Sequence, residues 1–394
     1  MIPKQDQFEK GGGRLDGHGL ADALMGMGIQ QYKTDVGFRT LMESVNEDLY
    51  VIPKYQRKYR WTREQVVGLV RSLICGLPIP PIYTCRNAEN QLEILDGQQR
   101  IMSLFFYYIG HYLDKKRGSS IDFSEIQITD GSFRDALMEQ FALEELHIQI
   151  KGKKGELFNV DYGTLPVEIK RRVDYTTITI IEIKIDDTTQ RSEILRQIFA
   201  NLNKDGPQLS RQEQRNGIYT CKFYDMLQDY NKHNARWRKI WGREDAKERD
   251  TETLLRLCAL KKYVRVKRQG GTRFDLLVEG YTSSYAEMLD RFSEEAMGFD
   301  EKQSAEYRES LDRFLGLFTV DRTQSTKVAL MESLYIVHEK MGVDKPITPE
   351  IYDRILKDKR YKAHARQGTV KMKSMNERWK AVYEIWIGDD KGGR

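Results

Sequence analysis

The stretch of sequence that most constrains the fold is 92–110, LEILDGQQRIMSLFFYYIG, where an apolar strand runs directly into an apolar helix. The aliphatic residues of 92–96 are typical of a buried strand, and the apolar run behind them predicts a buried helix over about 98–112. Two buried elements have to pack as layers of one mixed core. Residues 96–100 between them are polar or flexible, although a connecting turn needs only Asp-Gly. The surplus of polar groups indicates that something is bound at this joint.

Short elements of both kinds surround the joint. Helical spacing and β-branched alternation predict helices at 38–45, 62–76, 133–142, the start of 165–186 and 191–203, and strands at 49–53, 82–85 and the end of 165–186. The helix at 62–76 carries its own limits, with Thr62 as N-cap and Gly76 as its end. This order of elements favours a small α/β or α+β unit.

From residue 209 onward only helical patterns occur, broken at 268–275 and 342–350. We expect the first of these helices to bury its apolar face against the mixed domain. The predicted fold is therefore α+β, with a small mixed α/β domain followed by an all-α helical domain. The predicted boundaries are a flexible lead over 1–30 with a short helix near 20–27, a mixed domain over 31–205 and a helical domain over 206–394.

Composition excludes several classes of protein. The chain has 394 residues, 40% hydrophobic and 31% charged, which is enough for two or three globular domains. No apolar run approaches the roughly 20 residues that span a bilayer, and no signal peptide opens the chain, so we expect a cytoplasmic protein without a membrane partner. The scattered cysteines are expected to be reduced. A net charge of +5 permits nucleic acid binding without demanding it.

The five residues at the joint carry the groups that bind phosphate. A helix N-terminus has unpaired N–H groups and a partial positive charge. Gly97 lets the backbone approach a ligand closely, and Arg100 adds a bidentate donor. Gln98 and Gln99 can orient a water or bind a base or sugar, while Asp96 can hold Mg²⁺ or polarise a water. The alternative is a plain turn with a surface arginine, and the residues alone leave both interpretations open.

A second polar stretch, IPKYQRKYRW at 52–61, follows a predicted strand. Its aromatic and guanidinium groups, among them Tyr55, Gln56 and Arg57, suit stacking on a base and clamping a phosphate. The alternative is that Tyr55 and Trp61 cover the core while the arginines are solvated.

These two stretches together resemble the N-terminal domain of GmrSD-type restriction proteins, known as domain-of-unknown-function family 262, whose fold is shared with ParB and sulfiredoxin. A third segment, IFANLNKDGPQLSRQEQRNGIY at 198–219, is similar to the family pattern LN..G..LS..E.RN. The three segments occur in the family's order, and the resemblance covers about residues 36–220.

The resemblance implies binding and hydrolysis of a nucleoside triphosphate with Mg²⁺, in prokaryotic defence against phage DNA. It implies catalytic roles for Asp96, Gln98, Gln99 and Arg100, a metal contact for Asp96, and nucleotide contacts for Tyr55, Gln56, Arg57, Gly97, Arg100 and Asn203. The other positions that match the third segment are Gly206, Ser210, Glu213 and Asn216. For these a structural interpretation is favoured, with a turn at Gly206 and a helix that Ser210 and Glu213 cap.

The end of the chain departs from larger family members, which often carry a nuclease domain with a His-Asn-His metal site. Here the late histidines are His338 and His364, neither with a metal-ligand partner at useful spacing. A separately encoded nuclease subunit is therefore the expected partner for any DNA cleavage.

Two basic runs lie in the helical half, at 261–273 and 357–380. Such runs can follow a phosphate backbone, and the predicted DNA contacts are Lys261, Lys262, Arg265, Lys267 and Arg268. The alternatives are a solvated face or a surface for a partner protein.

Three functions stay open at this point. The first is a nucleotide-hydrolysing component that senses or acts on DNA, with modified phage DNA as a candidate target. The second is a non-hydrolysing scaffold for DNA or protein, switched by nucleotide. The third is a ParB-fold nuclease, which would need further metal ligands.

Overall fold

The computed structural model describes residues 29–53, 59, 61–87, 89–113, 126, 128, 131–185, 191–202, 210–245, 247–268, 274–319, 328–365 and 370–388. The chain divides into two compact units between Phe199 and Ala200. The predicted lead and its helix near 20–27 lie outside the described residues, apart from the last two residues of the lead. Among the described residues, no helix combines the length and apolarity needed to cross a bilayer.

The first unit is built on a five-stranded mixed sheet with the strand order β1-β9-β3-β4-β2. Its strands are β1 (Ile29–Gly37), β2 (Tyr50–Val51), β3 (Ile82–Arg86), β4 (Leu92–Asp96) and β9 (Thr177–Ile185). β9 lies antiparallel to β1 and parallel to β3, while β4 lies antiparallel to β3 and parallel to β2. All of these strands except β1 were predicted. β1 is an edge strand with mostly exposed side chains, so no apolar alternation marks it.

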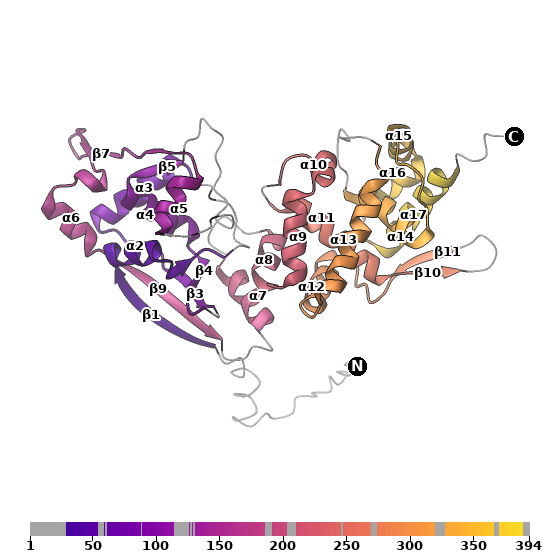
Figure 1. The fold of residues 1–394 in the computed structure, drawn as a ribbon, viewed down its shortest axis with the longest axis horizontal. Helices are drawn as coiled ribbons and strands as arrows, with labels where there is room; N and C mark the ends of the chain where they lie inside the picture. Colours follow the sequence, from indigo (N-terminus) through magenta and orange to yellow (C-terminus); the bar gives the residue numbers. More distant parts are fainter. Residues whose placement is uncertain are drawn as a thin grey trace, which may run out of the picture. The chain divides into compact units, whose positions relative to one another are not determined.

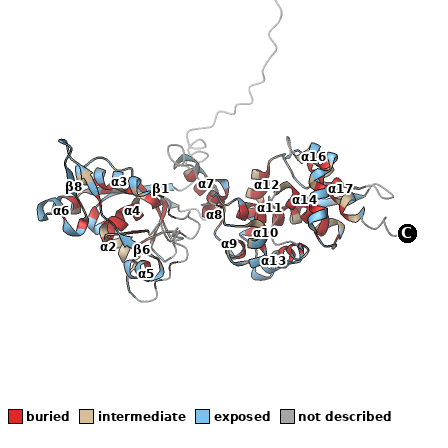
Figure 2. Ribbon diagram, turned by 90° about the horizontal axis from the view of Figure 1, so that it is seen from above, coloured by how far each residue is buried: buried red, intermediate tan, exposed pale blue. Residues whose placement is uncertain are grey.

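Helices cover this sheet, and in Figure 1 they lie above strands β1 and β9. They are α2 (Phe38–Asn46), α3 (Arg63–Cys75), α4 (Gln98–Ile109), α5 (Phe133–Gln140) and α6 (Val167–Asp174). The limits predicted for α3 are confirmed, because Thr62 forms a capping box with Gln65 and Gly76 ends the helix at φ +69°. Figure 2 shows α4 as largely buried, which agrees with its predicted place in the core.

The predicted extension of α4 to Tyr112 is wrong. Gly110 adopts φ +70° and ends the helix after Ile109. The next residues form β5 (His111–Leu113), which pairs with β6 (Leu143–Glu145). A second short ribbon, β7 (Gln149–Lys151) with β8 (Leu157–Asn159), and the 3₁₀ turn Tyr162–Thr164 occupy a region whose polar composition is typical of surface loops.

The second unit is helical, as predicted. After α7 (Arg191–Leu202), which crosses the division between the units, its helices are α8 (Arg211–Ile218), α9 (Lys222–His233), α10 (Ala235–Trp241), α11 (Arg249–Tyr263), α12 (Tyr285–Ala296), α13 (Glu301–Gly316), α14 (Val328–Met341), α15 (Pro349–Lys357), α16 (Lys359–Ala365) and α17 (Met372–Ile387). The apolar helix α14 is buried nearly all round and packs against α11 and α17.

One β-hairpin interrupts this helical unit, where only helices are predicted from the sequence. Its strands are β10 (Val264–Arg268) and β11 (Phe274–Val278), paired antiparallel. Val264 and Val266 alternate with Arg265 and Lys267, which is a strand signal that the high basic content hides. The overall class, a mixed unit followed by a helical one, is confirmed.

Candidate functional site

The junction of β4 and α4 depends on a glycine. Gly97 adopts φ +99°, a left-handed conformation, and no side chain caps the helix that it opens. A Cβ added to Gly97 would lie 3.0 Å from Cγ1 of Ile82 and 3.2 Å from Nη2 of Arg100. Glycine is therefore required here both by the backbone conformation and by the close approach of β3.

An ion pair spans the first turn of α4. Nη2 of Arg100 donates to Oδ2 of Asp96 at 2.6 Å and to the carbonyl oxygen of Pro81 at 2.9 Å. The Arg100 side chain is 20% exposed and the Asp96 side chain 41% exposed. Arg100 is thus held between the end of one strand and the start of another, and it is not the solvated surface arginine of the alternative interpretation.

The two glutamines of the junction are buried. Oε1 of Gln99 accepts a hydrogen bond from the backbone N–H of Trp61 at 3.1 Å. The Ser103 hydroxyl donates to the Gln99 carbonyl oxygen and lies 2.6 Å from the Tyr59 hydroxyl. The end of the 52–61 stretch is therefore fastened to α4 directly behind the junction.

Tyr59 has a structural role, because its buried hydroxyl lies within hydrogen-bond distance of Ser103. Burial raises its pKa far above the ordinary value of 10.0, so the hydroxyl stays protonated at any physiological pH. Trp61, for which the sequence left a role in covering the core open, is partly buried. Its carbonyl oxygen accepts a hydrogen bond from the Tyr112 hydroxyl. The predicted nucleotide contacts Tyr55, Gln56, Arg57 and Asn203, and the predicted turn at Gly206, lie outside the described residues.

For Mg²⁺ the junction offers one carboxylate. Among the described residues no group of three or more His, Cys, Asp or Glu side chains could hold a metal ion. Mg²⁺ often binds one or two carboxylates together with substrate phosphates, so Asp96 fits that use once its ion pair with Arg100 opens. His338 is buried, and its Nδ1 lies 2.8 Å from Asp344 and 3.2 Å from the Val343 carbonyl oxygen. All four cysteines are free, as expected.

A cavity of about 270 Å³ lies beside α4. Its lining is apolar except for Asp48, whose pKa burial raises although Gln91 donates a hydrogen bond to it. The lining residues are Val45, Asp48, Tyr50, Val51, Ile52, Ile94, Ile101, Met102, Ile126, Ile128 and Phe133. None of residues 96–100 is among them, so this cavity suits an apolar group and not the phosphates predicted for the junction.

The third segment has the structural role that its residues favoured. Ser210 and Glu213 form the predicted capping box at the start of α8. Asn216 is buried and accepts a hydrogen bond from Gln212 at 2.9 Å. Both capping residues act within one turn of helix, which is why the sequence alone could identify them.

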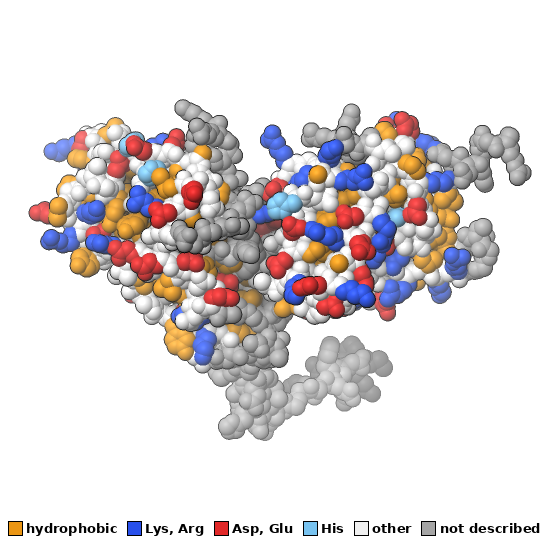
Figure 3. Space-filling view, viewed as in Figure 1, with side chains coloured by type: hydrophobic (Ala, Val, Ile, Leu, Met, Phe, Trp, Pro, Cys, Tyr) orange, Lys and Arg blue, Asp and Glu red, His pale blue; other side chains and the backbone are white. Residues whose placement is uncertain are grey.

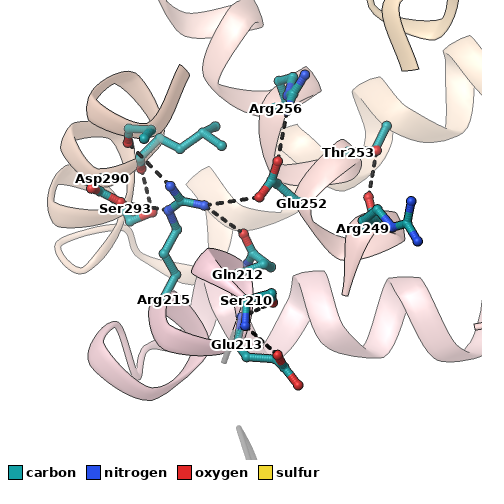
Figure 4. A network of polar contacts seen from close by, with 12 residues as sticks. Ser210, Gln212, Glu213, Arg215, Arg249, Glu252, Thr253, Arg256, Asp290 and Ser293 are labelled. Carbon is teal, nitrogen blue, oxygen red and sulfur yellow. Dashed lines mark hydrogen bonds and ion pairs between the residues drawn. The ribbon is translucent and has the colours of Figure 1, made fainter. Parts of the chain in front are cut away.

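Arg215, in the same helix, is a candidate that sequence reasoning missed. Its side chain is 3% exposed, and its Nε donates to Asp290 at 2.7 Å while its Nη1 lies 3.4 Å from Glu252. Figure 4 shows this guanidinium at the centre of a polar network that joins α8, α11 and α12. The signal was the arginine in the family pattern E.RN, whose acidic partners are distant in sequence.

Residues 38–220 match the family model described as GmrSD restriction endonuclease, N-terminal domain. Over these residues, referred to below as the GmrSD domain, the chain is similar to this family. The resemblance predicted from the three segments is confirmed, and a GmrSD domain implies a restriction-like defence protein. No curated protein matches the chain.

The GmrSD domain extends from the start of α2 to just beyond α8. The division between the compact units falls inside it, at Phe199. The motif at residues 96–100 therefore lies in the mixed unit, whereas α8 of the third motif belongs to the helical unit.

The predicted DNA contacts lie outside the GmrSD domain, on α11 and β10. Lys261, Lys262 and Arg265 form ion pairs with Glu339, Glu295 and Glu279 respectively. Lys267 and Arg268 are exposed on β10. Figure 3 shows Lys and Arg interspersed with Asp and Glu on the visible face of the helical unit. Since three of the five residues are already paired with carboxylates, Lys267 and Arg268 are the better candidates for phosphate contacts.

Proposed function

We propose that this chain is the component of a restriction-like defence system that binds and hydrolyses a nucleoside triphosphate and acts on DNA. The observation that carries the proposal is Arg100, held by Asp96 at the start of a helix that no side chain caps. A helix N-terminus and a fixed guanidinium are the groups that bind phosphate oxygens. The GmrSD domain supports the biological setting. DNA cleavage is assigned to a separately encoded nuclease subunit.

In this proposal the triphosphate binds to the guanidinium of Arg100. A phosphate oxygen replaces the Asp96 carboxylate as the partner of the guanidinium, which releases Asp96 to orient the attacking water or to hold Mg²⁺. Mg²⁺, when bound, supplies neutralisation of the phosphate charge. Gln99 keeps the first turn of α4 in place through its hydrogen bond to Trp61, and Gln98 is buried beside it.

Calorimetry with each nucleoside triphosphate in the presence of Mg²⁺ tests the binding site. Arg100→Ala removes one charge-assisted hydrogen bond to the phosphates and should weaken binding by about 1.5–3 kcal/mol. Arg39→Ala is the matched control, because Arg39 lies in the same unit and forms an exposed ion pair with Glu43. Thermal unfolding of both variants separates loss of binding from loss of fold. Equal affinity in Arg100→Ala and in the unsubstituted chain would remove the site from this junction.

Measuring phosphate release distinguishes a chain that hydrolyses the triphosphate from one that only binds it and switches conformation. The second candidate is a non-hydrolysing scaffold, in which Asp96 keeps its ion pair with Arg100 and activates no water. If the chain hydrolyses, Asp96→Ala should abolish phosphate release while the protein stays folded, because Asp96 is half-exposed at the end of its strand. Tight binding without phosphate release in the unsubstituted chain would instead establish the scaffold.

A further inference from the structure

The two edges of the sheet in the first unit are built differently. At one edge β2 has two residues, and Pro53 stands two residues beyond it. A short edge strand next to a proline is a common protection against pairing with another chain. At the other edge β1 runs for nine residues, Ile29–Gly37, and contains no proline. β1 is therefore the edge at which a further strand can add.

β1 is also regular along its whole length. Each residue from Ile29 to Gly37 pairs with one residue of β9, without the bulge that natural sheets often use to turn an edge away. β9 is its one neighbour among the described strands, and Figure 1 shows β1 as the outermost strand of this sheet. Residues 29–35 are all exposed. Every second residue of an antiparallel strand directs its N–H and C=O groups away from the paired neighbour, so the outer side of β1 presents a row of backbone donors and acceptors.

The two charged residues of β1 lie on the same side of the sheet. Lys33 and Asp35 are two positions apart, opposite Ile181 and Thr179 of β9. Lys33 forms no ion pair with the described residues, while Asp35 accepts a hydrogen bond from the Thr179 hydroxyl at 2.6 Å. A lysine and an aspartate at this spacing are complementary to the same pair in a strand that runs in the opposite direction.

A second copy of β1 in antiparallel orientation fits this order of charges. With Thr34 opposite Thr34 of the second copy, Lys33 of each copy stands opposite Asp35 of the other. The same register sets Tyr32 opposite Val36 on the other side of the sheet. Opposite charges and aromatic–β-branched pairs are both favourable across an antiparallel pair. A register centred on Lys33 would instead oppose two lysines and one centred on Asp35 two carboxylates, and like charges directly opposite are unfavourable.

We propose that β1 is a homodimer interface, at which two copies of this chain join their sheets edge to edge in antiparallel orientation. The joined sheet has ten strands, five from each copy. The dimer is symmetric, because each copy supplies the same strand to the contact. Backbone hydrogen bonds between the two copies of β1 then satisfy the outward groups of both edges. This assembly is independent of nucleotide binding at the junction.

Sedimentation equilibrium of the full chain over a range of concentrations tests the dimer. The unsubstituted chain should approach twice the monomer mass as the concentration rises. Lys33→Asp should raise the dissociation constant by about tenfold, because it replaces an attraction by a repulsion at two symmetric places. Asp35→Lys should weaken the dimer in the same way. The double variant Lys33→Asp with Asp35→Lys exchanges the two charges and should restore association.

The matched control is Lys151→Asp. Lys151 is exposed on β7, in a separate two-stranded ribbon of the same unit, so this variant should dimerise as the unsubstituted chain does. Thermal unfolding of every variant separates a lost interface from a lost fold. Amide hydrogen exchange locates the interface, because alternate amides of β1 should exchange more slowly above the dissociation constant than below it.

The proposal is overturned if the unsubstituted chain stays monomeric, if the exchange of charges fails to restore association, or if Lys151→Asp weakens the dimer as much as Lys33→Asp does. Protection of β1 that is the same at every concentration would also overturn it, and would assign the edge to another segment of the same chain.

Discussion

At the residue scale, replacing Gly97 or Gly68 by alanine should change stability in opposite directions. Gly97 has φ +99° and lies against Ile82, so Gly97→Ala should lower the free energy of unfolding by about 1–2 kcal/mol or more. Gly68 lies inside α3 with open space around it, so Gly68→Ala should raise that free energy by roughly 0.5–1 kcal/mol. Urea unfolding of both variants checks the pair. A neutral or stabilising Gly97→Ala would contradict the proposed close packing.

Glu248 is expected to make stability depend on pH. Burial raises its pKa from the ordinary value of 4.5 to about 7, and the charges of Asp250, Glu213 and Glu244 act in the same direction, against the hydrogen bond from Thr251. Because the folded state holds the proton more tightly than the unfolded chain, the stability that this proton contributes is present at pH 4.5 and is lost as the pH rises to about 7.

Glu248→Gln keeps the hydrogen-bond acceptor and removes the charge. At pH 8 the variant should therefore be more stable than the unsubstituted protein, by up to about 3 kcal/mol. The difference should shrink towards pH 5, which denaturant unfolding at the two pH values would measure. Glu309→Gln, at an exposed position of α13, serves as the control. An equal gain at both pH values would show that Glu248 titrates normally.

At the scale of the elements, local signals predicted boundaries well. The capping boxes at Thr62 and Ser210 depend only on residues within one turn, and both occur where the sequence placed them. The expectation that the helix starting near 209 packs on the mixed domain stays a prediction. α8 and α9 pack against α11, α12 and α13 in the helical unit, a choice that depends on partners far along the chain.

The hairpin β10–β11 can be tested at this scale, because side chains of α17 bind it: Met372 and Lys380 contact β11, and Asn376 makes two hydrogen bonds to it. Oδ1 of Asn376 accepts from the backbone N–H of Leu276 at 2.9 Å, and its Nδ2 donates to Asp275 at 2.8 Å. Asn376→Ala should leave the buried Leu276 amide without its acceptor, at a cost of about 1–3 kcal/mol. Amide hydrogen exchange at Leu276 should then become faster, while Lys373→Ala, exposed on the same helix, should leave it unchanged. Unaltered exchange in Asn376→Ala would mean that the strand pairing and the contacts of Met372 and Lys380 hold the hairpin without Asn376.

At the scale of the whole molecule, the question is whether the basic residues outside the GmrSD domain contact DNA. Neutralising Lys261, Lys262, Arg265, Lys267 and Arg268 together should weaken DNA binding. It should also flatten the salt dependence by up to about 0.9 log units for each phosphate that the protein no longer neutralises. The ion pairs refine this prediction, since Lys261 and Lys262 are paired with Glu339 and Glu295.

The double variant Lys267→Gln with Arg268→Gln should therefore weaken DNA binding more than Lys261→Gln with Lys262→Gln. Binding isotherms at several salt concentrations measure both the affinity and the slope. Nucleotide hydrolysis without DNA should be the same in both double variants, because the junction at Asp96 is untouched. Unchanged DNA affinity in the fivefold variant would leave these residues as a solvated face and favour a protein partner.

What the sequence determined by itself is local or shared with a family: the strand, turn and helix around Gly97, the capping boxes, the helical second half and the GmrSD resemblance. These depend on residues a few positions apart or on motifs in a fixed order. The tertiary structure alone decided that Gln99 holds Trp61, that β1 pairs with β9, and that Arg215 and Arg256 find Asp290 and Glu332. In each of these pairs the two partners lie tens of residues apart in the sequence. They meet only where the fold packs the elements together, because a buried charge and an unpaired strand edge are both unfavourable.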